Sequence, residues 1–267
     1  MDHSQKKKIK ALNREFAALQ RQESRLMRSA VKAKPAGWKT AMEQKVPAKV
    51  YTGLNSAFCK GFSLVFQHGR KLIELTYKKE ALQQKYTAQN DDFREMGQRR
   101  NIRALHKNAR GSNNLNVAAT TLEGIGLGAL GIGMPDIALF LTTVLRGIYE
   151  TALHYGFDYE SRFEKMLILK MMAASLSTGG DWFSRNREVN DLLRLDDCEI
   201  SAEEFEKQIQ QTSQVFAMDM LLLKFVQGLP VVGILGGAAN PLYYSRVMRY
   251  VQLKYRRRYL LKLQKNM

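Results

Sequence analysis

A dense run of glycine near the middle of the chain restricts the folds that it can adopt. Five glycines fall within ten residues, inside a stretch at 116–155 that is almost entirely apolar or small. Each glycine in a water-exposed helix costs about 1 kcal/mol against alanine, so a helix keeps such a set only where close packing offsets the loss. Three of them recur at spacings of 4 and 3, and a second small set nearer the C-terminus could face them. The spacing predicts six helix-packing residues: Gly124, Gly128, Gly131, Gly233, Gly236 and Gly237.

The same glycines could instead form a loop that binds phosphate. However, the run Gly124-x-Gly126-x-x-Ala129 has neither a preceding strand nor the later acidic residue of a dinucleotide site. The chain also contains no Gly-Lys-Ser/Thr sequence, which a P-loop requires. We therefore favour helix packing over phosphate binding, and we expect no cofactor.

Apolar residues elsewhere recur at the spacing of a helix that buries one face. Leu12, Phe16 and Leu19 form one such stripe, and no run of useful length alternates with period two as a strand would. The chain therefore predicts an all-α fold, a compact multi-helix bundle with two glycine-rich apolar helical hairpins and a basic N-terminal helical arm. We expect the hairpins at 116–155 and 215–245. The other expected helices cover residues 4–30, 51–86, 91–110, 160–176, 184–195 and 201–227, with a last helix from 231 or 241 to the C-terminus.

We expect two parts in this chain, a basic helical arm at 1–50 and a helical domain at 51–267. Several local signals set the expected helix ends. Pro135 suits the first turn of a helix, and Ser201 with Glu204 forms a Ser-x-x-Glu capping box. Gly111, preceded by Arg110, suits a helix end.

Positive charge is concentrated at the two ends of the chain. The whole sequence has 42 Lys and Arg against 25 Asp and Glu, a net charge of +17. Residues 1–110 carry +16 and residues 246–267 carry +8, whereas residues 111–245 carry −7. Such basic segments need an acidic partner or a solvated surface: nucleic acid, anionic lipid or an acidic protein face.

Neither apolar hairpin contains a simple membrane-spanning helix. Residues 124–135 are uncharged but too short, and residues 225–245 are interrupted by Pro230 and Pro241. The hairpins could either form a soluble core or dip into a bilayer as helices. With no secretory signal and only two cysteines, Cys59 and Cys198, we expect a cytoplasmic protein, peripheral to the inner face of the membrane if it associates with one.

Arg146, Glu150 and His154 follow one another at a spacing of four residues, and Asp158 lies one further step along. This polar column predicts either a salt-bridged strip on one helix face or a carboxylate and an imidazole acting as acid and base. We favour the structural strip because no nucleophile is evident nearby. His68 and His106 are expected at the surface of basic helices, and no metal site is expected.

Tyrosine and arginine alternate in the last helix, a combination that suits a membrane interface. The alternative is a final helix packed on the core with a solvated basic side. The sequence predicts these residues as lipid or membrane contacts: Arg249, Tyr250, Tyr255, Arg256, Arg257 and Arg258.

Two groups of these motifs together resemble the EcsC family over roughly residues 51–260. The central group reads Gly131-x-Gly133-x-Pro135-Asp136, then Arg146, then Ala152-x-x-Tyr155-Gly156-x-Asp158. The C-terminal group reads Pro230-Val231-Val232-Gly233-x-x-Gly236-Gly237-x-x-Asn240. The resemblance implies a helical protein without an established catalytic activity, encoded beside the subunits of an ABC exporter. It identifies signature positions of unknown role: Asp136, Arg146, Tyr155 and Asp158.

The sequence therefore predicts a non-catalytic, membrane-surface-associated protein that binds lipid or a membrane transport complex, and the resemblance implies a role accessory to an ABC-type exporter. One alternative is a basic helical protein that binds nucleic acid, although no such motif occurs and the acidic middle interrupts a continuous phosphate track. The other is a hydrolase that uses Glu150 and His154.

Overall fold

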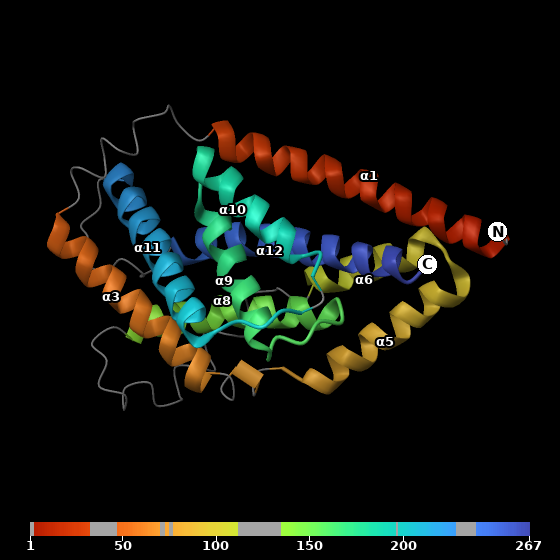
Figure 1. Cartoon of the computed structure of the whole chain (residues 1–267), viewed down its shortest axis with the longest axis horizontal. Helices are drawn as coiled ribbons and strands as arrows, with labels where there is room; N and C mark the ends of the chain where they lie inside the picture. The colour runs from red at the N-terminus through yellow and green to blue at the C-terminus, as the bar shows by residue number, and fades with distance from the viewer. Residues whose placement is uncertain are drawn as a thin grey trace.

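The computed structural model shows a bundle of helices arranged along one long axis (Figure 1). It describes residues 3–32, 47–69, 73–74, 77–111, 135–195, 197–227 and 239–267. Within these ranges every regular element is helical and no strand occurs, which confirms the predicted all-α bundle. The six glycines predicted to pack helices, and the turns of both predicted hairpins, lie outside the described residues.

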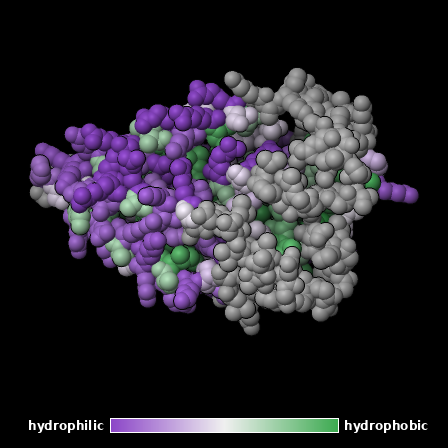
Figure 2. All heavy atoms as spheres, turned by 180° about the vertical axis from the view of Figure 1, so that it is seen from behind, coloured by the Kyte–Doolittle hydropathy of each residue, from purple (hydrophilic) through white to green (hydrophobic). Residues whose placement is uncertain are grey.

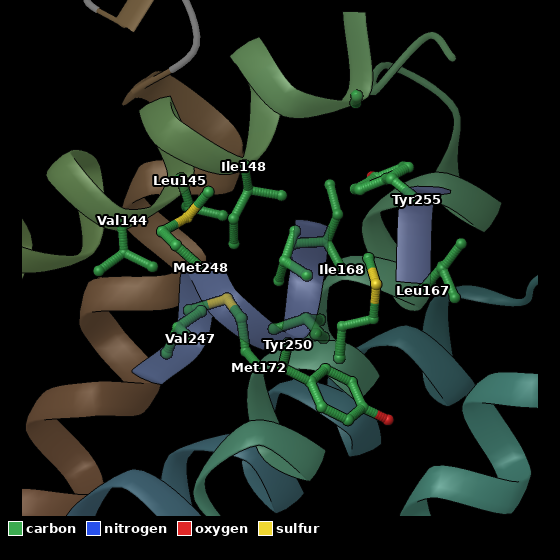
Figure 3. Close-up of a cluster of buried hydrophobic side chains, with 14 of the residues drawn as sticks. Val144, Leu145, Ile148, Leu167, Ile168, Met172, Val247, Met248, Tyr250 and Tyr255 are labelled. Carbon is green, nitrogen blue, oxygen red and sulfur yellow. The ribbon is translucent and has the colours of Figure 1, made fainter. Parts of the chain in front are cut away.

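The helix α12 (Ala239–Lys265) lies at the centre of the molecule and contacts α1 (His3–Lys32), α8 (Pro135–His154) and α9 (Arg162–Leu176). Because neighbours surround it, α12 buries residues on several faces instead of one stripe. Val247, Val251 and Leu260 are all completely buried. Figure 3 shows side chains of α12 interleaved with those of α8 and α9 in this cluster. The labelled residues are Val144, Leu145, Ile148, Leu167, Ile168, Met172, Val247, Met248, Tyr250 and Tyr255.

Two helix pairs lie at opposite ends of the long axis (Figure 1). At one end α3 (Ala48–Leu64) packs against α11 (Ala202–Gln227), with Phe216 of α11 between Phe58 and Phe62 at ring distances of 5.5 and 5.6 Å. At the other end α5 (Lys79–Met96) pairs with α6 (Arg99–Gly111). The remaining helix, α10 (Gly179–Leu192), packs on α9.

The N-terminal helix α1 lies against α12 and α6 along its apolar stripe. Leu12 and Leu19 are buried and Phe16 is partly buried against the core, as the spacing predicts. Leu26 also packs against the core, partly buried. Glu15 lies on the same face and is also buried, so this stripe contains one charged side chain.

The predicted continuous helix over 51–86 is wrong. α3 ends at Leu64 and passes into a π-helical turn, η1 (Val65–Gly69). Ile73 and Glu74 are helical, but Tyr77 and Lys78 are not, and α5 begins at Lys79. On either side of the break, Phe66 packs on Phe205 of α11, whereas the Tyr77 hydroxyl donates to the Tyr159 hydroxyl at 2.8 Å. Phe66 and Tyr77 thus contact different parts of the bundle, and the interrupted helix allows both contacts to form.

The predicted helix over 91–110 also begins too early, because its first residues belong to α5. Gly97 separates α5 from α6 with a φ of +60°, and its N–H donates to the Phe93 carbonyl at 2.8 Å. A left-handed glycine directly after a helix is a common helix end. The helix predicted at 184–195 is found at Gly179–Leu192.

Local end signals are otherwise confirmed. α8 begins at Pro135, and α6 ends at Gly111. The capping box is complete: Ser201 Oγ accepts from the Glu204 N–H at 3.1 Å, and Glu204 Oε2 accepts from the Ser201 N–H at 2.8 Å. In the part of the chain that the structure describes, no helix combines the length and the apolar character needed to cross a bilayer.

Candidate functional site

Exposed cations gather on two adjacent helices, α1 and α6. α6 contains five Lys or Arg and no Asp or Glu, and it packs directly against α1. None of the exposed cations forms an ion pair with a residue in the described ranges. We call these side chains the basic surface: Lys6, Lys7, Lys10, Arg14, Arg21, Arg25, Arg28, Arg100, Arg103, Lys107 and Arg110.

The acidic side chains of α1 lie toward α12 and not on this surface. α1 contains only two carboxylates, Glu15 and Glu23. Glu15 Oε2 accepts from Arg256 at 2.6 Å, and Glu23 accepts from Lys254 and Arg257. The negative charge of α1 is thus neutralised inside, and the outer side of the helix remains positive. Viewed from behind, the end of the molecule that contains α1, α5 and α6 has a largely hydrophilic described surface (Figure 2).

Most residues of α12 predicted as membrane contacts lie inside the bundle instead. Tyr250 is 1% exposed and Tyr255 is fully buried. Their hydroxyls donate to Asn186 at 2.9 Å and to Glu164 at 2.6 Å. Burial is the main cause that raises the pKa of both tyrosines well above the usual value.

The three consecutive arginines of α12 bind carboxylates on other helices. Arg256 binds Glu15, Arg257 binds Glu23 at 2.5 Å, and Arg258 binds Glu164 of α9 at 2.6 Å. Arg256 and Arg258 are buried. Successive helical residues point about 100° apart, so three adjacent arginines reach different neighbours. Among the six predicted contacts, only Arg249 is exposed.

The structure brings together part of the polar column. Arg146 Nε donates to Glu150 Oε1 at 2.9 Å, an ion pair between successive turns of α8. His154 is 2% exposed, and burial, with a smaller contribution from Lys85, lowers its pKa to about 4. Thr142 and Thr151, on the same helix, donate their hydroxyls to backbone carbonyls four residues earlier. The carboxylate of Glu150 is thus held by an arginine and the imidazole of His154 is neutral, and the structural strip stays a prediction.

Asp158 is not part of the column, contrary to the expected step of four residues. α8 ends at His154, and Gly156 turns the chain away with a φ of +73°. Asp158 is exposed, and its Oδ1 accepts from the Glu160 N–H at 3.1 Å. The side chain of Asp136 lies outside the described residues.

Tyr155 and His106 form a buried pair that the sequence did not predict. The Tyr155 hydroxyl lies 3.1 Å from His106 Nδ1, and the two residues are 2% and 7% exposed. Burial, with the positive charges of Arg256 and Arg110, lowers the pKa of His106 to about 2, so the imidazole is neutral. The expectation of a surface histidine is therefore wrong for His106, whereas His68 is exposed as predicted.

Two glycines outside the predicted set allow close helix contacts. A Cβ at Gly147 of α8 would lie 2.5 Å from the hydroxyl of Tyr244 on α12. A Cβ at Gly61 of α3 would lie 3.1 Å from Ile137 and from Leu141 of α8. Neither glycine belongs to a series at spacings of 3 and 4 residues, so the sequence pattern did not indicate them.

The described residues contain no group of three His, Cys, Asp or Glu side chains that could hold a metal ion. Cys59 and Cys198 are free thiols.

In the comparison with known proteins, the model of the EcsC protein family matches residues 10–260. The match begins within α1, earlier than the region of resemblance expected from the motifs, and so covers most of the basic surface. The same comparisons found no match among curated proteins and none among solved structures.

Proposed function

The chain belongs to the EcsC protein family, and from that premise we propose that it is a non-catalytic protein that docks on an anionic membrane surface. The observation that carries the proposal is the basic surface of α1 and α6, whose exposed cations form no ion pair with described residues. Each Lys or Arg near an anionic bilayer contributes about 1 kcal/mol to binding. Several acting together would hold the protein at the inner face of the membrane. An accessory role beside an ABC-type exporter, which the family resemblance implies, stays a prediction.

The docking elements proposed here differ from those that the sequence suggested. The cations of α12 at 256–258 are engaged by carboxylates of α1 and α9, so they are not available to lipid headgroups without opening the bundle. α6, by contrast, has a continuous exposed side with Arg100, Arg103 and Lys107. Its opposite side, with Ile102, Leu105 and Ala109, is buried.

Vesicle flotation tests the proposal. We expect the purified protein to float with vesicles of phosphatidylcholine mixed with phosphatidylglycerol, and not with phosphatidylcholine alone. Binding should weaken as the salt concentration rises, because salt screens exposed charges. The triple variant R100E/R103E/K107E should lose most of this binding.

The matched control changes the same amount of charge at the other end of the molecule. Lys49 and Lys60 on α3 and Lys207 on α11 are exposed, and Figure 1 places these helices at the opposite end from α6. The variant K49E/K60E/K207E should keep most of the binding. Equal loss in both variants would mean that net charge alone drives association. Strong salt-sensitive binding to mixed-sequence RNA or DNA with no binding to vesicles would favour the nucleic-acid alternative instead.

A further inference from the structure

A half-open cavity of about 630 Å³ lies where α1, α6 and α12 meet. Its lining comes from three parts of the chain that are far apart in sequence, and the Tyr155 ring after α8 adds a fourth. The volume falls within the range of about 300–1,000 Å³ that is usual for small-molecule sites. The cavity adjoins the basic surface, since Arg25 and Arg110 belong to both.

Positive charge surrounds the mouth of this cavity. Arg25 of α1, Arg110 of α6 and Arg249 of α12 line it, and all three are exposed. None of the three forms an ion pair with another described residue. Guanidinium groups bind carboxylates and phosphates through paired hydrogen bonds, so three arginines lining one cavity suit an anionic group.

Two polar nitrogens in the lining have no hydrogen-bond partner within the described part of the chain: Nε2 of His106 and Nε of Arg256. Their side chains are only 9% and 10% exposed. Glu15 Oε2, the acidic atom near Nε2, is 3.7 Å away, beyond a hydrogen bond. Both nitrogens are themselves buried, so a ligand in the cavity would meet the exposed arginines at its mouth and not these two atoms.

Apolar and aromatic side chains also line the cavity, beside the polar residues Gln22, Ser29, Ser245 and Gln252. Leu26 from α1 and Met248 and Leu253 from α12 line it, together with the rings of Tyr155 and Tyr244. An inorganic anion would leave this apolar wall uncovered, and a hydrocarbon would leave the arginines unused. The combination is complementary to a molecule with both parts.

We propose that this cavity binds a single-chain amphiphile with an anionic headgroup, a carboxylate or a phosphate monoester. The headgroup lies among Arg25, Arg110 and Arg249, and the hydrocarbon chain lies against Met248 and Leu253. The inference deepens the proposed function and rests on it for the source of the ligand, a membrane whose surface the adjoining helices contact.

Titration calorimetry of the full chain tests the proposal, with palmitate and lysophosphatidate as probes, each below its micelle concentration. We expect saturable binding of one or both probes, which also distinguishes a carboxylate from a phosphate headgroup. Lysophosphatidylcholine, which has no net charge, and inorganic phosphate, which has no chain, should each bind at least tenfold more weakly. Equal binding of either control would overturn the proposal.

Two sets of variants locate the site. Ser245 is exposed and lines the cavity, so S245W should fill it and abolish binding, whereas Q264W, at an exposed position further along α12, should not. The double variant R110Q/R249Q should weaken binding about tenfold or more, because each arginine would lose a charge-assisted hydrogen bond. R187Q/R194Q, away from the cavity lining, is the matched control. Unchanged binding by S245W would place the ligand elsewhere.

Vesicle flotation of the same proteins keeps the two proposals apart. S245W should still float with anionic vesicles although it no longer binds palmitate or lysophosphatidate. R100E/R103E/K107E should still bind the amphiphile although it no longer floats, since none of these three side chains lines the cavity. If the unmodified protein binds the amphiphile but does not float with anionic vesicles, the docking proposal is overturned and the cavity proposal stands.

Discussion

Nη2 of Arg256 on α12 donates a hydrogen bond of 2.6 Å to Oε2 of Glu15 on α1, across 241 positions of sequence. The Glu15 side chain is 1% exposed, and its other oxygen accepts from Arg99 of α6 at 2.5 Å. One carboxylate therefore joins α1, α6 and α12. Two ion pairs of Glu23 with Lys254 and Arg257 repeat the connection two turns further along α1.

Replacing this carboxylate should destabilise the whole bundle. E15Q keeps the shape of the side chain but leaves Arg256 without its charged partner in a buried site. Breaking one side of a buried ion pair costs about 3–5 kcal/mol. We expect the free energy of unfolding, measured by urea denaturation, to fall by that amount.

An exposed pair of similar length provides the control. Lys170 binds Glu188 at 2.7 Å, with side chains 22% and 49% exposed. Because solvent screens such a pair, E188Q should change stability by less than about 1 kcal/mol. If E15Q were as mild as E188Q, the contact of α1 with α12 would not contribute to stability in solution.

Gly156 is the position where a small substitution should have the largest effect. Its φ of +73° disfavours any side chain, and a Cβ there would lie 2.1 Å from the ring of Tyr86. Left-handed backbone and overpacking each cost about 1–3 kcal/mol, so G156A should lower the free energy of unfolding by at least about 2 kcal/mol. Thermal and urea denaturation both report this change.

Replacing Gly53 by alanine should instead raise the free energy of unfolding. A Cβ at Gly53, inside α3, would meet nothing within 4 Å. Alanine in a helix is favoured over glycine by about 1 kcal/mol, so G53A should stabilise the protein slightly. A destabilising G53A together with a neutral G156A would contradict the packing around both residues.

Features set by residues close in sequence were predictable here. The stripe of Leu12 and Leu19 follows from helical period alone, and the capping box of Ser201 and Glu204 requires only three residues of separation. The interruption between α3 and α5 was not predictable, because it depends on the contacts of Phe66 and of Tyr77 with distant elements.

The difference between local and long-range contacts also explains why most of the residues predicted for membrane contact lie inside the bundle. A tyrosine- and arginine-rich helix fits both a bilayer interface and the interior of a bundle that supplies carboxylates. The partners, Glu15, Glu23 and Glu164, lie 91–241 positions away from the α12 residues that they bind. Composition indicated a cationic helix correctly, but only the fold determines which cations remain exposed.

Acid should destabilise the protein through its two buried histidines. In the folded chain the pKa of His154 is lowered to about 4 and that of His106 to about 2, whereas the ordinary value is 6.5. Between pH 6.5 and 4 the unfolded chain therefore binds protons that the folded chain does not. Stability is fully present above pH 6.5 and is lost as the pH falls toward the folded pKa values.

H154Q isolates the contribution of one imidazole to this loss. A pKa difference of one unit corresponds to about 1.4 kcal/mol, so His154 accounts for about 3 kcal/mol between pH 6.5 and 4. We expect the free energy of unfolding of H154Q to fall less steeply over this interval than that of the unmodified protein, whatever its value at pH 7. H68Q, which changes an exposed histidine, should keep the original slope. Parallel curves for H154Q and the unmodified protein would mean that the imidazole of His154 titrates normally in the folded chain.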